Sequence, residues 1–319
     1  MVDSFNRRNY LKGVAGGVTS IGIATSASAQ GEQSEGDGES PEEASSKASA
    51  PSPYAPVVEQ AAVTGGAAAE NLFRTGLDVE YKEDSKAAVV TDADRAAQAT
   101  AIDTLTRAYP DAPIIGEEKV GEATKEVPSD GLAFTVDPID GSYNYTRGNA
   151  LWCTSVAAID SAKAVAAATV VPERDDIYTG DPTGVRRNDR PVSVSDRSDP
   201  TGFMVAPTYW WGFDSRDQFA TATGEVVRRF SDLRRYGSTQ LALAAVAAGE
   251  IEAAITNLDD LNPWDTIAGA ALVEWAGGTV TDLRGNDWCY GSRGLVASNG
   301  RAHAEVVEAT QQIEEAASE

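Results

Sequence analysis

Residues 132–148 read LAFTVDPIDGSYNYTRG, and the interpretation of the whole chain depends on this stretch. The short apolar run 132–136 ends at Asp137, and a second aspartate, Asp140, follows three positions later with a Gly-Ser pair behind it. Asp-Pro and Asp-Gly pairs are common turn formers, so the simplest interpretation is a polar turn after a buried strand. The alternative is that the two aspartates converge on a bound cation.

Strand and helix patterns alternate on both sides of this stretch. Apolar runs predict strands at 87–90, 112–115, 132–136, 152–160, 164–171, 203–207 and 251–255. Helical spacing, caps and stop signals predict helices at 55–75, from Thr91 or Asp92 to Tyr109, and at 238–249 and 262–278. The polar residues 173–200 carry neither pattern. Mixed strands and helices of this kind predict an α/β or α+β chain built in layers.

The N-terminus has the composition of a targeting segment. Arg7 and Arg8 precede a weakly apolar stretch, and residues 27–29 form an Ala-Ser-Ala cleavage pattern. The apolar run is short and rich in Gly, Ser and Thr, which argues against a membrane-spanning helix. Residues 1–29 therefore predict a twin-arginine signal, a route that exports folded proteins, and an extracellular or cell-surface location.

The rest of the chain divides by composition into three parts. Residues 30–53 are acidic and rich in Ser, Gly and Pro, which predicts a disordered linker. The folded part is expected to comprise an N-terminal α+β half, 54–198, and a C-terminal α/β half, 199–319.

The charge of the chain limits its partners. The sequence has 319 residues with 26 Lys and Arg against 49 Asp and Glu, a formal net charge of −23. Such a surface repels nucleic acid and anionic membranes, so neither a nucleic acid polymer nor an anionic membrane is expected as a partner. A stable membrane span after signal cleavage is not expected either, since the apolar run is too short. The acidic residues are spread along the whole chain, which is typical of a halophilic surface.

Histidine and cysteine are scarce. His303, the single histidine, lies near the C-terminus, which argues against a histidine base or a zinc site built on histidine. Cys153 and Cys289 could pair in an oxidising exterior, but two cysteines so far apart are more often simply buried.

Five carboxylates fall at the ends of predicted elements. Asp94 lies in the first turn of a helix, and Glu117, Asp137 and Asp140 follow strands; Asp265 is the third residue of its helix. Taken singly, each is explained by a helix N-terminus, a solvated loop or a turn. Because layered α/β folds build their sites at strand ends and helix starts, the five together favour one shared site.

Three motifs carry a family resemblance. GEE at 116–118, DPIDGS at 137–142 and WDTIAGAALVEWAGG at 264–278 resemble, in order and spacing, the motifs of the inositol monophosphatase family. That family comprises magnesium-dependent phosphatases and includes fructose-bisphosphatases and nucleotide 3′-phosphatases. Residues 85–97 resemble its Thr-x-x-Asp segment, and 236–255 resemble its Gly-Ser helix near the substrate. The resemblance covers 55–310 and implies an αβαβα sandwich of the sugar-phosphatase type.

The resemblance implies two or three Mg²⁺ ions held by oxygen ligands. One ion would be held by Glu117, Asp137 and the backbone carbonyl of Ile139. A second would be held by Asp137, Asp140 and Asp265. Asp94 would reach a third, weaker ion together with Glu117, largely through water. Carboxylates with one carbonyl suit Mg²⁺, which prefers hard oxygen ligands, lowers the pKa of bound water and neutralises phosphoryl charge.

The resemblance also implies catalytic and substrate-binding roles. Asp94, Glu117 and Ser142 would be catalytic, Ser142 standing where the family usually has a threonine that orients the attacking water. Backbone N–H groups of Gly141 and Ser142 would bind phosphate at a helix start. Further substrate contacts would come from Gly237, Ser238 and Asp265.

The substrate expected from the resemblance is a small sugar or inositol phosphate. Residues 256–263, TNLDDLNP, lack the sugar-contacting Glu and His of animal inositol enzymes and carry Asp259, Asp260 and Asn262 instead. Fructose 1,6-bisphosphate and a 3′-phosphonucleotide therefore remain alternative substrates. The family is often dimeric, so a homodimer is an open expectation.

Two other classes of protein fit part of the sequence. The segment 89–96 also resembles the Asp-x-Asp motif of haloacid-dehalogenase-type phosphatases, in which Asp92 would be a covalent nucleophile. Ala96 stands where that motif prefers Thr or Val, and the three later motifs stay unexplained. A non-catalytic exported ion- or ligand-binding protein is the second alternative, and the complete carboxylate set argues against it.

Overall fold

The computed structural model of the chain describes residues 50–76, 80–81, 89–208, 216–256 and 261–318. The expected signal, most of the expected linker, half of the predicted strand 87–90, and Asp259 and Asp260 lie outside these residues. The described helices are α2 (Ala55–Leu72), α3 (Asp92–Ala108), α4 (Ser142–Tyr145), α5 (Arg216–Arg229), α6 (Thr239–Ala247), α7 (Pro263–Trp275) and α8 (His303–Ser318).

The strands form one large, one medium and one small sheet. Their bounds are β1 (Glu80–Tyr81), β2 (Val89–Val90), β3 (Ile114–Gly116), β4 (Leu132–Asp140), β5 (Cys153–Asp160), β6 (Lys163–Val171), β7 (Asp176–Asp181), β8 (Gly184–Arg187), β9 (Arg190–Val192), β10 (Met204–Pro207), β11 (Asp232–Leu233), β12 (Ala253–Ile255), β13 (Thr279–Thr281) and β14 (Val296–Ser298). The seven-stranded sheet runs in chain order from β3 to β9, with β3 and β4 parallel and the other pairs antiparallel. The five-stranded sheet has the order β11-β10-β12-β14-β13, and β1 pairs with β2.

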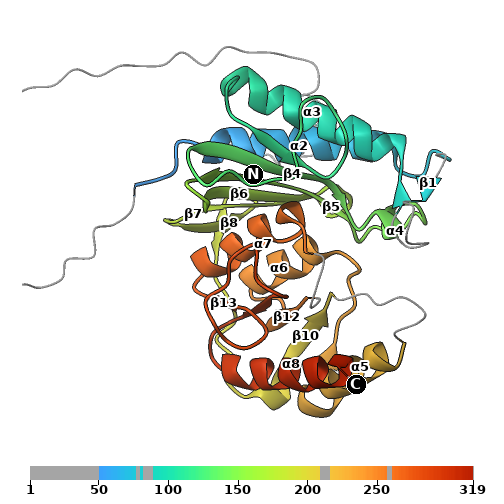
Figure 1. The fold of residues 1–319 in the computed structure, drawn as a ribbon, viewed down its shortest axis with the longest axis vertical. Coiled ribbons are helices and arrows are strands. Elements are labelled where there is room, and N and C mark those ends of the chain that lie inside the picture. Colours follow the sequence, from blue (N-terminus) through green and yellow to red (C-terminus); the bar gives the residue numbers. More distant parts are fainter. Residues whose placement is uncertain (1–49, 77–79, 82–88, 209–215, 257–260, 319) are drawn as a thin grey trace, which may run out of the picture.

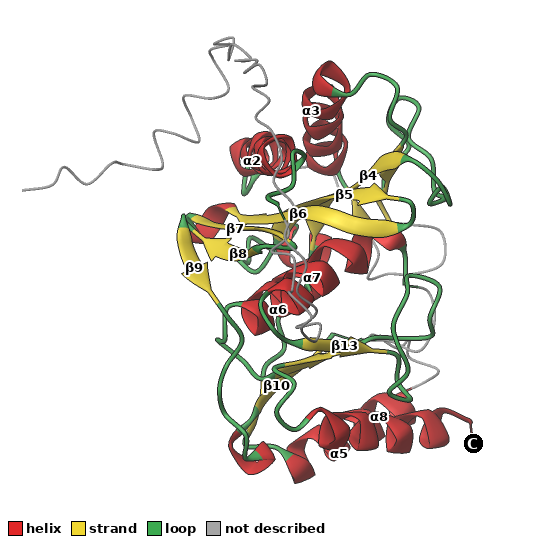
Figure 2. Ribbon diagram, turned by 90° about the vertical axis from the view of Figure 1, so that its left-hand side faces the viewer, coloured by secondary structure: helices red, strands yellow, loops and turns green. Residues whose placement is uncertain are grey.

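The elements stack as five layers, which confirms the expected αβαβα sandwich. Helices α2 and α3 cover the outer face of the seven-stranded sheet, and α6 and α7 lie between the two sheets (Figure 1). Helices α5 and α8 cover the far face of the five-stranded sheet (Figure 2). The middle layer packs on both sheets, because the apolar cluster around α6 and α7 includes Ile159 of β5 and Ala254 of β12.

Burial on both faces explains the long apolar strands of the large sheet. In β5, Val156 packs toward α2 and α3, while its neighbour Ala157 packs toward α6 and α7. Alternate side chains of a strand point to opposite faces, so a strand covered on both sides is apolar at nearly every position. Helix α6 is buried on all sides for the same reason, since it lies in the middle layer, and most of its residues are apolar.

Two sequence expectations on secondary structure are wrong. Strand β4 does not end at Val136 but continues through Asp137 and Pro138 to Asp140. The polar residues 173–200 are not featureless, since β7, β8 and β9 lie there as antiparallel strands at one side of the large sheet. Helices α5 and α8 and strands β11, β13 and β14 were not among the predicted elements.

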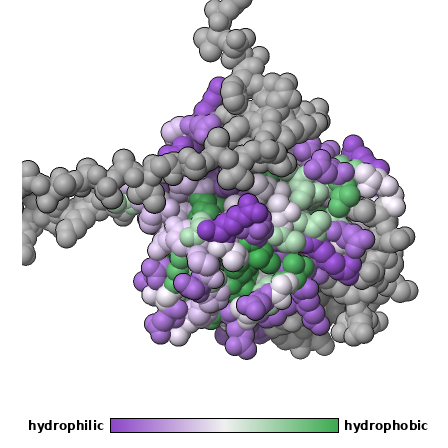
Figure 3. Space-filling view, turned by 90° about the horizontal axis from the view of Figure 1, so that it is seen from above, coloured by the Kyte–Doolittle hydropathy of each residue, from purple (hydrophilic) through white to green (hydrophobic). Residues whose placement is uncertain are grey.

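The two cysteines and the hydrophobic side chains differ in their exposure to solvent. Cys153 is buried as expected, whereas Cys289 is exposed, and both thiols are free. Seen from above α2 and α3, hydrophilic and hydrophobic residues are mixed (Figure 3). Of the large hydrophobic side chains in the described ranges, Tyr143 and Val227 are the exposed ones. Within those ranges, no helix has both the length and the apolar character that a membrane crossing requires.

Candidate active site

Strand β4 places two aspartates on either side of an irregularity in its pairing with β5. Asp137 is opposite Ser155 and Asp140 is opposite Cys153, and the register shifts between them. The shifted segment is anchored from both sides. The Thr154 hydroxyl donates a hydrogen bond of 2.7 Å to the Pro138 carbonyl, and the side chain of Ile139 is 1% exposed in an apolar cluster. A bulge of this kind re-aims side chains at the end of a strand, here two carboxylates.

Asp94 serves both its own helix and the site. Its Oδ2 accepts hydrogen bonds from the backbone N–H and the hydroxyl of Thr91, at 2.8 and 2.7 Å, in a capping box at the start of α3. Its Oδ1 accepts a hydrogen bond of 3.2 Å from the Ser142 hydroxyl. The carboxylate is fully buried, and one oxygen faces the residues that follow β4.

Asp265 is held in the same way at the start of α7. Its Oδ2 accepts from the backbone N–H and the side-chain amide of Asn262, at 3.0 and 2.9 Å. Pro263 occupies the first turn, so the predicted cap and helix start are confirmed. The capping interpretation and the shared-site interpretation are therefore compatible, since a capping carboxylate uses one oxygen for the cap.

Asp140 is oriented from the start of α6. Its Oδ2 accepts hydrogen bonds from the Ser238 hydroxyl, at 2.8 Å, and from the backbone N–H of Gln240. Ser238 is the N-cap of α6 and is 3% exposed. In this arrangement the Ser238 hydroxyl orients a carboxylate, and its expected contact with substrate stays a prediction, as does that of Gly237.

Mutual repulsion and burial mark the carboxylates as one electrostatic group. Burial, with smaller contributions from neighbouring charges, raises the pKa of Asp94 to about 6 and that of Asp265 to about 7. Burial also raises the pKa of Asp140 to about 6, against the opposing effect of its hydrogen bonds to Ser238 and Gln240. Glu117 contributes to each of these shifts through its negative charge.

Asp137 lies at the centre of this group. Burial raises its pKa well above the ordinary value, and the charges of Glu117, Asp140, Asp265 and Asp94 raise it further. Its Oδ1 is buried without a hydrogen-bond partner. A buried carboxylate oxygen with four acidic neighbours and no donor is stabilised by a cation, so the residues fit the expected metal.

The carboxylates are near one another without closing on a point. Within the described ranges, no three side chains of His, Cys, Asp or Glu are close enough together to form a metal centre as they stand. Their hydrogen bonds to Thr91, Ser238 and Asn262 hold one oxygen of three of the carboxylates. Ligation by all the expected residues would therefore require side-chain movements.

Ser142 and Gly141 follow the two aspartates as expected, at the start of the short helix α4. The Ser142 hydroxyl donates toward the Ile139 carbonyl, at 2.9 Å, and toward Asp94. Gly141 adopts a φ of +95°, and a Cβ atom there would lie 2.9 Å from the Leu151 carbonyl oxygen. Only glycine fits this turn without strain.

A pocket of about 460 Å³ opens beside the carboxylates. It is lined by Glu117 and Glu118, by Asn262 and Trp264 at the start of α7, and by three cationic side chains: Arg95, Lys119 and Lys125. The Lys125 ammonium lies 4.3 Å from the centroid of the Trp264 ring and donates a hydrogen bond to the Glu117 carbonyl. Cations at the rim of a carboxylate site suit an anionic ligand.

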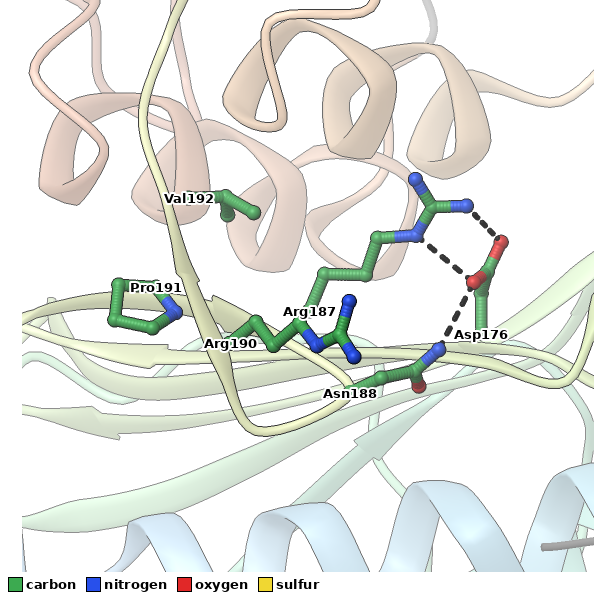
Figure 4. Close-up of a pocket in the computed structure, with 6 residues that line it drawn as sticks. All are labelled: Asp176, Arg187, Asn188, Arg190, Pro191 and Val192. Carbon is green, nitrogen blue, oxygen red and sulfur yellow. Dashed lines mark hydrogen bonds and ion pairs between the residues drawn. The ribbon is translucent and has the colours of Figure 1, made fainter. Parts of the chain in front are cut away.

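A second pocket, of about 570 Å³, lies away from the carboxylates beside β7, β8 and β9 (Figure 4). The Arg187 guanidinium donates two hydrogen bonds to the Asp176 carboxylate, at 2.8 and 2.7 Å, and forms an ion pair with Glu250 at 2.6 Å. Because two carboxylates already neutralise this guanidinium, Arg187 is poorly suited to bind a further anion.

The covalent-nucleophile alternative does not fit the geometry of Asp92. Its side chain is 80% exposed and pairs with Arg95 at 3.1 Å, one turn along α3. The carboxylate group around Asp137 includes Asp94 instead, two residues further on.

The five layers and the carboxylates at element ends define a sandwich with an acidic site beside its large sheet. The chain belongs to the inositol monophosphatase family, whose model matches residues 51–315. This is a family of phosphatases.

Its relatives include proteins with different names. Nus factor SuhB of Escherichia coli strain K12 is 32% identical over 250 residues, which cover 76% of this chain and 90% of that protein. The fructose-1,6-bisphosphatase/inositol-1-monophosphatase of Thermotoga maritima is 28% identical over 71% of this chain and 84% of its own length.

Solved structures agree on the fold. The extragenic suppressor protein SuhB from Bartonella henselae matches with a TM-score of 0.73 at 27% identity, over 80% of this chain and 97% of that one. The Thermotoga maritima IMPase matches with a TM-score of 0.71 at 24% identity, over 82% and 96%.

Proposed function

We propose that the chain is a Mg²⁺-dependent phosphomonoesterase that hydrolyses a small sugar or inositol phosphate. The observation that carries this proposal is the buried, unpartnered Oδ1 of Asp137 in the midst of four other carboxylates. Such a group is unfavourable unless a cation neutralises it. The match of the family model to residues 51–315 supports the same conclusion.

The expected ligands would hold two Mg²⁺ ions, and a third ion would be reached through Asp94. These ligands are Glu117, Asp137, Asp140, Asp265 and the Ile139 carbonyl. When bound, Mg²⁺ supplies an acidified water and charge neutralisation for the phosphoryl group.

The chain's own groups orient the reactants. The Ser142 hydroxyl, between Asp94 and Ile139, is placed to orient the attacking water. The turn at Gly141 leaves room for phosphate oxygens to approach the backbone N–H groups that follow it.

The substrate would be a compact anion. Arg95, Lys119 and Lys125 line the pocket beside Glu117, which favours a sugar carrying one or two phosphates in a chain of otherwise strongly negative charge. The Thermotoga relative is named for both fructose-1,6-bisphosphatase and inositol-1-monophosphatase activity, so both esters are candidates here. A 3′-phosphonucleotide is the third.

A non-catalytic role is the second candidate, because several relatives at 32% identity are named Nus factors. In that case the carboxylates would bind Mg²⁺ without turnover.

We further propose that the chain is exported through the Arg7-Arg8 signal and that its surface is halophilic. Loss of secretion in an Arg7→Lys, Arg8→Lys double variant would support the export proposal. A homodimer stays a prediction.

The decisive experiment is phosphate release by the protein lacking residues 1–29, in high salt, with and without Mg²⁺. The substrates are inositol 1-phosphate, fructose 1,6-bisphosphate and 3′-phosphoadenosine 5′-phosphate, with Asp140→Asn as the control. Mg²⁺-dependent turnover that is lost in Asp140→Asn supports the phosphatase. A folded protein that binds Mg²⁺ and hydrolyses none of the esters supports the non-catalytic role.

A further inference from the structure

Two glutamines are fully buried directly behind the carboxylates. Gln98 and Gln240 both have exposed fractions of 0%. A glutamine side chain buried in such a place lowers stability unless its amide donors and its carbonyl acceptor form hydrogen bonds. In both cases the bonds connect one carboxylate-bearing segment to another.

Gln98 connects α3 to the loop after β3. It lies one helical turn after Asp94, on the same face of α3. Its Nε2 donates to the Glu118 carbonyl at 2.7 Å, and its Oε1 accepts from the Glu118 backbone N–H at 2.8 Å. One amide therefore fixes both polar groups of the residue next to Glu117.

The sequence of the loop is adapted to this contact. A Cβ atom at position 116 would lie 2.7 Å from Nε2 of Gln98, so the glycine of the GEE motif lets the loop reach the amide. The position of Glu117 is thus set by the helix that carries Asp94.

Gln240 connects the end of β4 to α7. Its backbone N–H donates to Asp140, while its side chain reaches α7: Nε2 donates to the Trp264 carbonyl at 2.6 Å and Oε1 accepts from the Gly269 N–H at 2.7 Å. Asp265 follows Trp264 directly. Gly269 again permits the close approach, because a Cβ atom there would lie 2.5 Å from Cβ of Leu243.

The two amides and two further contacts form a closed circuit. Lys125 joins the Glu117 loop to the Trp264 ring, and Ser142 joins Asp94 to the segment after Asp140. Residues from α3, the loop after β3, the end of β4 and the start of α7 are thereby held at fixed separations around Asp137.

We propose that Gln98 and Gln240 are positioning residues that set the spacing of the Mg²⁺-binding carboxylates, Gln98 for the Asp94–Glu117 pair and Gln240 for the Asp140–Asp265 pair. The inference rests on the metal site of the proposed function but not on its substrate. Mutation of groups that orient metal ligands from behind typically lowers metal affinity or activity by about 10- to 100-fold.

The test compares Gln98→Met and Gln240→Met with Asn299→Leu. Asn299 is a matched control because it is also a buried amide, 2% exposed, that bridges two backbone groups: it donates to the Arg197 carbonyl and accepts from the Arg301 N–H. Asn299 directly follows β14, a strand of the five-stranded sheet. Calorimetric titration with Mg²⁺ gives the affinity without any turnover, and thermal unfolding gives the stability.

All three variants are expected to lower Tm. The two glutamine variants are expected to weaken Mg²⁺ binding by about tenfold, while Asn299→Leu keeps the wild-type affinity. In the active enzyme, the half-saturating Mg²⁺ concentration rises and kcat at saturating Mg²⁺ is kept. If either methionine variant fails to fold, it is replaced by Gln98→Asn or Gln240→Asn. These variants keep the amide on a side chain that is shorter by one methylene.

Wild-type Mg²⁺ affinity in folded glutamine variants would overturn the inference, and so would an equal loss of affinity in Asn299→Leu. Mg²⁺ binding by a wild-type protein without phosphatase activity would overturn the proposed function alone. A wild-type protein that binds no Mg²⁺ would overturn both.

Discussion

The hydroxyl of Ser142 donates a hydrogen bond to Asp94, 48 residues earlier in the chain, at 3.2 Å. It is also 2.9 Å from the Ile139 carbonyl. One small hydroxyl is thus shared between the helix that carries Asp94 and the turn that follows Asp140.

Replacing Ser142 tests this role. Ser142→Ala is expected to lower kcat by about a hundredfold, because the water loses its orienting partner. Ser142→Thr keeps the hydroxyl and is expected to keep most of the activity. The measurement is steady-state kinetics at saturating Mg²⁺. A fall in Mg²⁺ affinity without a fall in kcat would show that Ser142 supports the ligands rather than the water.

Replacing Asp137 is expected to separate stability from activity. Asp137→Asn removes a buried carboxylate whose neighbours are all acidic, so the Mg²⁺-free protein should gain on the order of 1 kcal/mol in unfolding free energy at about pH 8. Activity and the Mg²⁺-dependent rise in Tm should both disappear. Asp103→Asn is the control, since Asp103 is an exposed aspartate paired with Arg107 on α3. A destabilised Asp137→Asn protein would contradict the account of repulsion.

The stability of the Mg²⁺-free protein is expected to depend on pH in an unusual direction. The folded-state pKa values of Asp94 and Asp140 are raised to about 6 and that of Asp265 to about 7, so the folded state binds more protons than the unfolded state between about pH 4 and pH 7. Stability contributed by these groups therefore falls as pH rises through this window. Thermal unfolding in EDTA should show a lower Tm at about pH 8 than at about pH 5.5, and Asp265→Asn should reduce the difference.

Mg²⁺ binding should show the opposite dependence. The metal competes with the protons on the same carboxylates, so its affinity should rise by about tenfold or more between about pH 5.5 and about pH 8. Calorimetry at the two pH values measures this directly. An affinity independent of pH would mean that these carboxylates are not the ligands.

Gly141→Ala tests the turn after Asp140. The left-handed φ alone costs about 1–2 kcal/mol for alanine, and the contact with the Leu151 carbonyl adds roughly another 1 kcal/mol. Gly131→Ala is the matched control, because Gly131 has a φ of +78° with no atom within 4 Å of its Cβ position. Chemical denaturation of both variants should show the larger loss at position 141. Equal losses would mean that the turn relaxes around the methyl group.

The layered fold could be predicted from the sequence because its strongest signals are long and apolar. The paired strands β5 and β6 were located to within one residue, and helix α7, with Asn262 as cap and Pro263 in the first turn, to within three residues. The strands between 173 and 200 could not be predicted in this way. They carry Asp, Arg and Thr, and although β7 is buried at every position except Ile177, β8 and β9 are mostly half-buried or exposed, so their apolar pattern is weak.

The end of β4 shows a second limit of the sequence. An Asp-Pro pair normally ends a strand, but here β5 and the Thr154 hydroxyl continue the pairing past Pro138. The five carboxylates could be named because each lies at an element end. Gln98 and Gln240 could not, because their partners are backbone groups far away in the chain. The available signal was a single glutamine among the apolar residues of α6.

The circuit that joins Asp94, Glu117, Asp140 and Asp265 spans 172 residues of sequence from its first member to its last. No fragment that lacks either sheet contains it. Occupancy by Mg²⁺ would therefore report that the elements from α3 to α7 have assembled. For a chain that we propose is exported already folded, Mg²⁺ binding would distinguish molecules in which this region is folded from those in which it is not.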